Sequence, residues 1–469
     1  MEIVGLTKEN VLKISSIKKE EDWIRDFRLK GYESFMKQDN PSFGPDVKLD
    51  YDKIVYYKSN DADKKIESDW NNVLKPVVDE LDDLGVLESE KHLGGMGVQY
   101  ESEVIYHNMI EELESKNVIF TSIETAMREH KDIVEKYFGK IVNMNENKFA
   151  ALNSAVFSGG SFIYIPKNTH LDRPLQSYFR INSKNMGQFE RTLIIVDDNS
   201  SLHYVEGCTA PTYSESSLHA AVVEIYVGKN SKCRYSTIQN WATNVYNLVT
   251  KRALVDEGGL MEWIDGNIGS KVTMKYPCCV LKGDNSSGTC ITIGVAKEGQ
   301  IQDTGARMIH IGKNTKSNIV SKSIASNGGN STYRGKVDIK KTAENSEAMV
   351  KCDTLILDGI SKSDTIPVNT CNNITSNIEH EATVSKISDE VLFYLMSRGL
   401  SEEKATELIV LGFLDRFLSV FTVGVVYLPC PIKVSSYSLF KSNEAVLISS
   451  ILDLPRLAFI SFLISSILP

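Results

Sequence analysis

The chain has few cysteines, and they are not arranged as ligands or as a disulfide scaffold. Its 469 residues include only eight cysteines, and no two of them form a C-x-x-C pair. This excludes a secreted disulfide framework and a preformed zinc ribbon. The residues after Met1 are rich in lysine and glutamate and lack the apolar run of a signal peptide. We therefore expect free thiols in a reducing, cytoplasmic compartment.

An excess of basic charge and the common catalytic motifs are also missing. The 52 basic and 61 acidic residues give a net charge of −9, which argues against a protein that mainly binds nucleic acid phosphates. The sequence contains no G-x-S-x-G elbow, no H-E-x-x-H, no kinase signature and no Walker A motif. ATP hydrolysis is therefore not expected in this chain.

Both ends of the chain predict helices. Apolar residues recur at helical spacing in Glu20–Lys37 and Ser122–Gly139, and residues 1–150 are assigned to an N-terminal helical domain. The glycine-rich segment Leu93–Gly97 lacks the context of a phosphate site and is predicted to be a turn. Two further helices are predicted at Asp389–Ser397 and Ser401–Phe417, within a C-terminal segment 385–417.

Between these ends, residues 151–384 are rich in short β-branched runs separated by turns. The turns align on marks that share Asn or Gly, spaced by 31, 28, 27, 29 and 31 residues: Asn199, Asn230, Gly258, Asn285, Asn314 and Asn345. A period near thirty is typical of a stacked solenoid, in which neighbouring repeats share one core. We predict a parallel β-helix, and the alternative is a large β-sandwich with similar turn spacing.

Several thiols and carboxylates could carry chemistry, although each has an ordinary structural explanation. Cys208 and Cys352 lie in or beside predicted strands, where a single cysteine is more often a small core residue. Strand alternation places Glu379 and Glu381 on one face and His380 on the other, so this segment could equally be a solvated edge. Lys251 is expected by default in a surface pair. From the residues alone, the function stays open.

Longer strings resemble a known family. They include Glu206-Gly207-Cys208-Thr209-Ala210-Pro211, Tyr235-Ser236-Thr237-Ile238-Gln239-Asn240-Trp241, Met308-Ile309-His310-Ile311-Gly312-Lys313-Asn314-Thr315 and Glu379-His380-Glu381-Ala382-Thr383. Over roughly residues 20–417, the chain resembles the SufB branch of the SufB/SufD family, which belongs to the SUF system of iron–sulfur cluster assembly. The resemblance implies a right-handed parallel β-helix flanked by helical domains.

The resemblance also implies roles for particular residues. Cys208 matches the thiol that accepts sulfur, and an internal route is implied at Glu190, Gln239, Trp241 and Lys251. The cluster-building end is implied at Cys352, Glu379, His380 and Glu381, with a transient iron–sulfur cluster of the [4Fe–4S] type as product. Thiolate sulfur suits iron, and a carboxylate could hold Fe²⁺ before sulfide arrives. Some family members also associate with reduced flavin, for which no residues are identified.

The implied partners follow from the same resemblance. A SufC-type ABC ATPase would dock on the apolar stripe at Leu408, Leu411, Leu414 and Phe417, although packing within the chain is the simpler explanation of that stripe. A SufD-type paralogue or a second SufB copy would complete the complex, a cysteine desulfurase with its sulfur shuttle would supply persulfide, and apo iron–sulfur proteins would receive the cluster. The chain itself would be an assembly scaffold and not an enzyme. The alternatives are a SufD-like architectural paralogue without a cluster and a carbohydrate-processing β-helix enzyme.

The last segment departs from the family pattern. Residues 418–469 are apolar and serine-rich, where the family usually continues with an acidic amphipathic helix. The apolar runs Leu418–Pro429 and Leu457–Pro469 are each shorter than the roughly 18–20 residues that span a bilayer. We expect a divergent or frame-altered tail and no membrane association.

Overall fold

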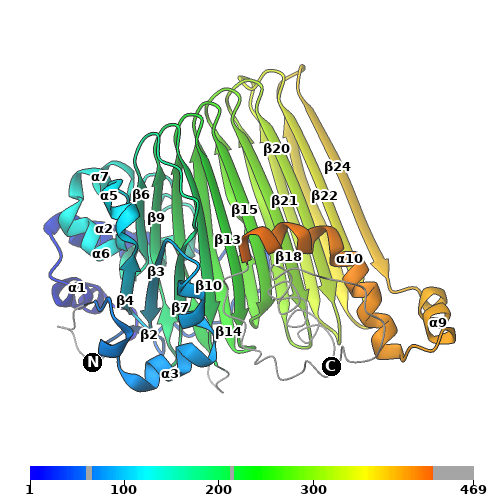
Figure 1. Cartoon of the computed structure of the whole chain (residues 1–469), viewed down its shortest axis with the longest axis horizontal. Coiled ribbons are helices and arrows are strands. Elements are labelled where there is room, and N and C mark those ends of the chain that lie inside the picture. The colour runs from blue at the N-terminus through cyan, green and yellow to red at the C-terminus, as the bar shows by residue number, and fades with distance from the viewer. Residues whose placement is uncertain (60–65, 212–215, 426–469) are drawn as a thin grey trace.

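Two long sheets that lie face to face form the body of the molecule (Figure 1). The computed structural model describes residues 1–59, 66–211 and 216–425. In spatial order, the first sheet contains β24 (Asn377–Lys386), β22 (Glu347–Ile356), β20 (Lys316–Ala325), β18 (Ser287–Ala296), β15 (Leu260–Gly269), β13 (Lys232–Trp241), β10 (Ser201–Thr209), β7 (Leu175–Arg180), β3 (Gly95–Tyr100) and β4 (Glu103–Met109).

The second sheet repeats the same progression on the opposite side of the core. Its main path contains β23 (Lys362–Cys371), β21 (Asn330–Ile339), β19 (Ile301–His310), β16 (Val272–Lys275), β14 (Val245–Val255), β12 (Val222–Val227), β9 (Arg191–Val196), β6 (Ser161–Ile165) and β5 (Ile119–Ser122). Three short strands pair beside this path: β8 (Gly187–Gln188), β11 (Ser217–His219) and β17 (Cys278–Leu281).

The register confirms the predicted solenoid. Ser201 lies opposite Lys232, Lys232 opposite Leu260, and Leu260 opposite Ser287, so each strand pairs in parallel with its equivalent one repeat later. Parallel pairing of equivalent strands cannot arise in a sandwich built from antiparallel hairpins. The β-sandwich alternative is therefore wrong.

The turn marks have the backbone geometry that their residue types suggest. All six have positive φ: 55° at Asn199, 53° at Asn230, 63° at Gly258, 59° at Asn285, 54° at Asn314 and 53° at Asn345. Glycine and asparagine tolerate this region best, which explains their recurrence. Hydroxyls that follow these marks join successive coils, as when the backbone N–H of Ser200 donates to Ser231 Oγ at 3.0 Å. The period therefore reflects one repeated corner.

The N-terminal part combines helices with strands that extend the two sheets. Its helices are α1 (Lys8–Ile17), α2 (Asp22–Lys37), α3 (Lys75–Asp83), α4 (Val86–Glu90), α5 (Glu111–Ser115), α6 (Ile123–Glu129), α7 (Lys131–Tyr137) and α8 (Lys148–Val156), with a 3-10 turn at Trp70–Asn72. Strands β1 (Glu2–Val4) and β2 (Val55–Lys58) pair with each other. Antiparallel pairing of β4 with β3 and of β5 with β6 ends the parallel stacking at this end.

The glycine-rich segment does not form the predicted turn. Gly95 begins strand β3, and a Cβ at this position would lie 3.0 Å from the carbonyl oxygen of Asn108 and from the Phe120 ring. A Cβ on Gly94 would come within 2.8 Å of Leu113. These glycines therefore allow close packing within the sheet, a role that their clustering alone does not distinguish from a loop.

At the other end, the chain leaves the solenoid as a helical pair, α9 (Asp389–Ser397) and α10 (Glu402–Val425), drawn in orange in Figure 1. The predicted cap at Ser401 is confirmed, because its Oγ accepts the Lys404 backbone N–H at 3.2 Å. Helix α10 folds back and contacts β10 and β13. No helix in the described ranges is long and apolar enough to cross a membrane. The predicted tail, residues 418–469, begins within helix α10, which continues to Val425, and from 426 onward it lies outside the described residues.

The corner geometry yields a stability prediction at Asn285. Asn285→Ala should lower the free energy of unfolding by about 1–2 kcal/mol, because a Cβ without a local polar group is strained at positive φ. Asn285→Gly should be close to neutral, since Gly258 occupies the equivalent corner. Urea unfolding of both variants checks this, and equal losses for alanine and glycine would contradict it.

Candidate functional site

Cys208 lies inside the solenoid near the end of strand β10. It is fully buried and shares the interior face of that strand with Glu206, because alternate residues point to the same side. An apolar cluster surrounds the thiol: Val55, Phe179, Ile181, Met186, Trp241 and Val245. The sequence-predicted sulfur acceptor is therefore enclosed and has no direct contact with solvent.

Glu206 is the centre of a buried hydrogen-bond network beside this thiol. Its carboxylate accepts from the Tyr235 hydroxyl, from Thr237 Oγ1 at 3.3 Å and from Gln239 Nε2 at 3.5 Å. The ammonium of Lys251 lies 3.4 Å away. Burial alone would raise the pKa of Glu206, but Lys251 and the Tyr235 hydrogen bond bring it below its ordinary value. Glu206 is therefore ionised inside the core.

A chain of polar side chains links Cys208 to Glu190. Gln239 Nε2 lies 4.0 Å from Cys208 Sγ, and Gln239 Oε1 accepts from Asn247 Nδ2 at 2.7 Å. His219 Nδ1 contacts Asn247 Oδ1 at 2.7 Å, and His219 Nε2 contacts a Glu190 carboxylate oxygen. Both ring nitrogens of His219 are thus engaged by neighbouring polar side chains. The structure thus brings Glu190 and Gln239 into one network with the thiol.

Trp241 separates this network from the surface. Its ring packs against His219 with centroids 4.6 Å apart, and its indole N–H is buried without a hydrogen-bond partner within the described part of the chain. Trp241 also lines a surface hollow of about 350 Å³, with Ala210, Asn240, Ala242, Thr243, Ile268, Gly269, Val295, Lys297 and Gln300. It is the predicted route residue that lies closest to a hollow on the surface.

Lys251 is an interior cation, so its default assignment to the surface is wrong. Its side chain is fully buried, and Nζ lies 4.3 Å from the centre of the Tyr235 ring. Burial lowers the pKa of Lys251. The Glu206 and Asp265 carboxylates raise it by more than burial lowers it, so the pKa lies above its ordinary value. Lys251 therefore carries a positive charge. Its neighbour Arg252 points outward and pairs with Glu146.

The same surroundings keep the Cys208 thiol protonated. Burial raises the pKa of Cys208 well above its ordinary value, and the negative charges of Glu206 and Glu190 add to this, while Lys251 opposes them. A thiol reacts as its thiolate. Cys208 is therefore chemically quiet until a partner or substrate changes its environment.

This protection can be measured against the exposed thiol of Cys371. At pH 7, iodoacetamide should alkylate Cys371 at least roughly tenfold faster than Cys208, since each unit of pKa lowers the thiolate fraction about tenfold. Mass spectrometry of timed samples would give both rates. Glu206→Gln should speed alkylation of Cys208, because it removes a negative charge beside the sulfur. Equal rates for Cys208 and Cys371 in the unmodified protein would contradict the assignment.

Cys352 and His380 form a second site in the last coils of the solenoid. Cys352 Sγ on β22 lies 3.5 Å from His380 Nε2 on β24, and Asn369 Nδ2 lies 3.1 Å from His380 Nδ1. Burial raises the pKa of Cys352 to about 11, with a further contribution from Asp353, and burial lowers the pKa of His380. A neutral thiol and a neutral imidazole therefore face each other in the last coil, where Cys352 is buried and His380 is partly exposed.

The two glutamates of this segment point away from the pair. Glu381 lies 3.1 Å from Lys351 Nζ on the outer face, and Glu379 accepts from Asn377 Nδ2 at 3.2 Å. Only the backbone carbonyl of Glu381 approaches Cys352 Sγ, at 3.6 Å. The structure therefore brings Cys352 and His380 together but not the side chains of Glu379 and Glu381, as strand alternation predicts.

This end of the solenoid is uncovered. Strands β23 and β24 are exposed along most of their length and carry apolar side chains, including Ile366, Val368 and Val384. Figure 1 shows β24 as the outermost strand among the described residues. Within the described residues, no three His, Cys, Asp or Glu side chains are grouped to hold a metal ion. The Cys352–His380 pair would therefore need further ligands from outside the described residues.

The predicted docking stripe on α10 is divided between the solenoid and solvent. Leu414 is fully buried, Leu411 is partly buried and Leu408 is 43% exposed, whereas the side chain of Phe417 lies outside the described residues. Lys322 anchors the helix by donating to the Phe413 carbonyl at 2.5 Å. Exposed Phe393, Tyr394 and Met396 lie on the neighbouring helix α9. The apolar surface available to a partner therefore comes from both helices.

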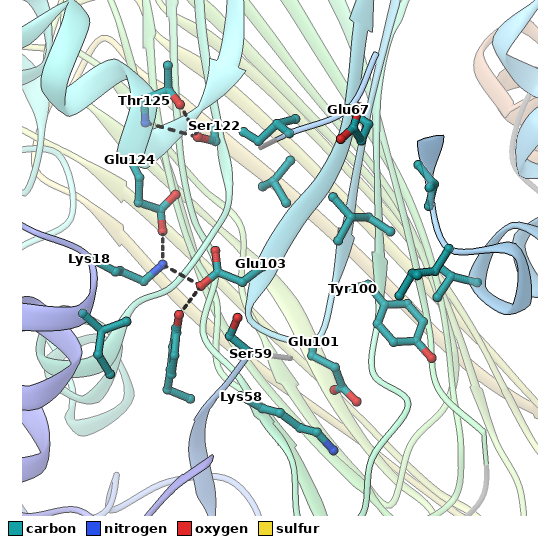
Figure 2. A pocket seen from close by; sticks show the side chains of 18 of the residues that line it. Lys18, Lys58, Ser59, Glu67, Tyr100, Glu101, Glu103, Ser122, Glu124 and Thr125 are labelled. Atoms are coloured by element: carbon teal, nitrogen blue, oxygen red, sulfur yellow. Dashed lines mark hydrogen bonds and ion pairs between the residues drawn. The ribbon is translucent and has the colours of Figure 1, made fainter. Parts of the chain in front are cut away.

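A separate pocket of about 340 Å³ lies in the N-terminal region (Figure 2). Lys18 extends between Glu124, at 2.8 Å, and Glu103, at 3.4 Å, and Tyr57 donates to Glu103 at 2.6 Å. Burial lowers the pKa of Lys18, but the two carboxylates raise it above its ordinary value. None of the sequence-predicted site residues lines this pocket. The Lys18 pairs join α1 to Glu103 on β4 and to Glu124 on α6.

Sequence reasoning missed several members of the interior network. Glu206, His219, Asn247, Asp265 and Lys275 are all buried there. Glu206 could have been found, because it lies two residues before Cys208 in a predicted strand and must share its face. The others come from different coils, and no local pattern relates them to Cys208.

Comparison with known proteins places the chain in a family. The family described as "SUF system FeS cluster assembly, SufBD core domain" matches residues 179–413, and "SufBD protein N-terminal region" matches residues 18–177. The chain belongs to the SufB/SufD family. The first match covers most of the solenoid and the start of its helical extension, including Cys208 and Cys352.

Individual relatives of this SufB/SufD-family chain are similar over most of their length. The chain is 55% identical over 415 residues to the iron-sulfur cluster assembly protein SufB of Bacillus subtilis, covering 88% of this chain and 89% of the relative. It is 56% identical, with the same coverage, to iron-sulfur cluster assembly SufBD family proteins of Staphylococcus epidermidis and Staphylococcus aureus. Iron–sulfur cluster assembly is therefore the process in which the family acts.

Proposed function

We propose that this chain is the scaffold on which iron–sulfur clusters are built in a SufB–SufC–SufD type complex in the cytoplasm. The observation that carries the proposal is the placement of Cys208 and Cys352 on interior faces of the same parallel sheet. Glu206 lies two residues before Cys208 on the same face of β10. The strand register places it in one row of buried polar residues that ends at Cys352. A sulfur acceptor and a cluster ligand would thus lie along one interior, with Cys208 enclosed and Cys352 near the uncovered end.

The first step would be sulfur acceptance at Cys208. A donor persulfide from a cysteine desulfurase and its shuttle reacts as R–S–S⁻ + Cys208–SH → R–SH + Cys208–S–S⁻. The donor S–S bond breaks, a new S–S bond forms to Cys208, and the Cys208 proton moves to the donor sulfur, so no net oxidation occurs. Gln239 and Lys251 support this step, because an amide N–H and an ammonium can stabilise an anionic persulfide in a water-poor core.

The second step would be cluster construction at the open end. Cys352 and His380 provide a soft sulfur and an imidazole nitrogen, both of which bind iron. Two donors are too few for a complete site, so a SufD-type paralogue or a second copy of this chain would cover β23 and β24 and supply the rest. Glu379 and Glu381 lie on the outer face, where they could hold incoming Fe²⁺. The product would be a transient cluster of the [4Fe–4S] type, passed to apo iron–sulfur proteins.

The remaining partner would be an ATPase that docks on α9 and α10. ATP hydrolysis is assigned to a SufC-type partner, and the exposed apolar side chains of these helices support docking there. Because α10 contacts β10 and β13, movement of the helix would displace the strand that carries Cys208. We assign no residues to a reduced flavin, and no step depends on one.

A SufD-like architectural role is the main competing function. It would need the solenoid and the helices but no sulfur acceptor or iron ligand, so the buried environments of Cys208 and Cys352 favour the scaffold. A carbohydrate-processing enzyme would place a carboxylate pair in an exposed groove. The carboxylates of this core are instead enclosed and paired with lysines, which does not favour that chemistry.

Anaerobic reconstitution of the purified complex with Fe²⁺, cysteine and the desulfurase system tests the scaffold. Cys208→Ala should lose the protein-bound persulfide, and Cys352→Ala should keep the persulfide at Cys208 but lose the visible absorbance and Mössbauer signal of the cluster. Cys371→Ala is the matched control and should retain both, because its thiol is exposed and lies outside the interior row. Normal cluster formation in both the Cys208 and Cys352 variants would favour the SufD-like role.

Docking of the ATPase can be tested with one charge on the exposed stripe. Leu408→Asp should weaken capture of the ATPase at least roughly tenfold, since it places a charge in an apolar contact without disturbing the core. Leu12→Asp is the control, because Leu12 is similarly exposed on a helix at the other end of the chain. Capture would be measured by pull-down at equal protein concentration. Unchanged capture by the Leu408 variant would remove this surface from the proposal.

A further inference from the structure

The charged core continues beyond Lys251 to a second buried pair. Lys275, at the end of β16, and Asp265, on β15, are both fully buried, with Nζ and Oδ1 3.3 Å apart. Lys251 Nζ lies 4.0 Å from the same carboxylate oxygen. Together with Glu206, these residues form a line of alternating charges, carboxylate, ammonium, carboxylate and ammonium, that leads away from Cys208.

This second pair is less completely bonded than the first. Within the described residues, neither Asp265 oxygen nor Lys275 Nζ makes an aligned hydrogen bond, and Asn267 Oδ1 nearby also has none. Buried charges normally fill their hydrogen-bonding capacity, because leaving it unfilled is costly. Asp265, Lys275 and Asn267 therefore have hydrogen-bonding capacity that a small polar ligand could use.

The pair lies between the two thiols of the proposed reaction. Parallel register aligns one interior residue from each strand in a continuous row: Glu206, Thr237, Asp265, Thr292, Ser321 and Cys352. Neighbouring strands are about 4.8 Å apart, so the row spans about 24 Å. A persulfide extends a cysteine by one S–S bond of about 2 Å. Sulfur held covalently on Cys208 cannot reach Cys352.

Beyond Asp265 the interior is lined by small polar side chains. The row continues through the hydroxyls of Thr292 and Ser321, and Gly294 lies in the adjacent row. A Cβ on Gly294 would lie 3.7 Å from Thr304 Oγ1 and 3.8 Å from Ser323 Oγ, with no closer neighbour. Hydroxyl groups can solvate a small anion, and the space beside Gly294 is about that of one methyl group.

We propose that Lys275 and Asp265 form a binding site for hydrosulfide midway between Cys208 and Cys352. This inference rests on the proposed function and deepens it. Release from Cys208 requires two electrons, which a dithiol reductant supplies: Cys208–S–S⁻ + dithiol → Cys208–SH + HS⁻ + disulfide. The S–S bond on Cys208 breaks, a disulfide forms in the reductant, and its two protons pass to Cys208 and to the released sulfide. Lys275 binds the anion, and Asp265 positions the ammonium and accepts the S–H hydrogen.

The charge on Lys275 is tuned for reversible binding. Burial lowers the pKa of Lys275 to about 8, and Asp265 on β15 partly opposes this, while Lys251 on β14 adds to it. Glu206 on β10 and the Cys290 thiol on β18 also face this group. The ammonium is therefore charged at neutral pH and loses its charge in mildly alkaline solution, unlike Lys251.

The test uses the whole complex with persulfide already loaded on Cys208. The double variant Lys275→Met, Asp265→Asn should load Cys208 as the unmodified protein does, but after addition of dithiothreitol and Fe²⁺ it should form cluster at least tenfold more slowly. Lys316→Met is the control, because Lys316 pairs with Glu347 on the surface. Alkylation with mass spectrometry measures the persulfide, and absorbance measures the cluster. Cluster formation at the unmodified rate in the double variant would overturn the proposal.

Two further readouts separate binding from a structural role. A pair that only stabilises the fold would lower the melting temperature when it is removed. A pair that leaves buried hydrogen-bonding capacity unfilled should leave the melting temperature unchanged or raise it. Lys275→Arg, which keeps the charge, should retain sulfide transfer and lose the decline that the unmodified protein shows above about pH 8. The site would be contradicted if the pH profiles of sulfide transfer coincided for Lys275→Arg and the unmodified protein. A lower melting temperature of the double variant would also contradict it.

A direct binding measurement keeps this inference separate from the proposed function. Anaerobic calorimetric titration with sodium hydrosulfide should show saturable binding to the unmodified complex and none to the double variant. If Cys208 never acquires a persulfide, the proposed function fails, while the titration still decides whether the Lys275–Asp265 site exists. Absence of saturable binding to the unmodified complex would overturn it.

Discussion

The parallel hydrogen-bond ladder between equivalent strands is the constraint on which the rest of this molecule depends. Once Ser201 is in register with Lys232 and Lys232 with Leu260, every residue between them is aligned with its equivalent in the next coil. Because strand side chains alternate, each interior position becomes a continuous row along the core. Residues about thirty positions apart thus become neighbours, as Glu206 and Thr237 do, and Asp265 follows one coil later in the same row.

The buried charges then determine the chemical character of the interior. One row is filled by apolar and aromatic side chains such as Tyr235 and Trp263, whereas the row beside it carries carboxylates and hydroxyls. Burying Lys251 and Glu206 is costly unless they pair, and their separation of 3.4 Å recovers part of that cost. A core designed only for stability would use apolar residues there. In this buried interior the ammonium groups favour a nearby anion. Burial and the carboxylates keep the Cys208 thiol neutral.

The two ends of the solenoid are treated differently. At the N-terminal end, antiparallel strands end the parallel stacking, and helices α1–α8 flank the sheets. At the other end, β23 and β24 keep free edges and exposed apolar residues, a combination that soluble proteins usually protect. The incomplete pair of Cys352 and His380 lies at this same edge. One partner that covers the edge would therefore bury the exposed apolar surface and also supply further ligands to the Cys352–His380 pair.

Local signals in the sequence predicted much of this architecture. The recurring Asn and Gly marks anticipated the corners, because positive φ restricts which residues can occupy them. Helical spacing located α2, α9 and most of α10, and alternation in Glu379–Glu381 correctly separated His380 from its flanking carboxylates. The glycine-rich segment at Gly95 was misjudged, since tight packing between strands and a sharp turn both select glycine.

The repeat, its corners and the face to which each strand residue points follow from local backbone geometry, so they can be read from the order of the residues. Which coils bring their charges together depends on how the strands pair. The pairing of Lys251 with Glu206, the second pair at Lys275, and the meeting of Cys352 with His380 depend on register between strands far apart in the chain. A shift of one residue in that register would turn the same side chains outward, so no local pattern could have specified the site.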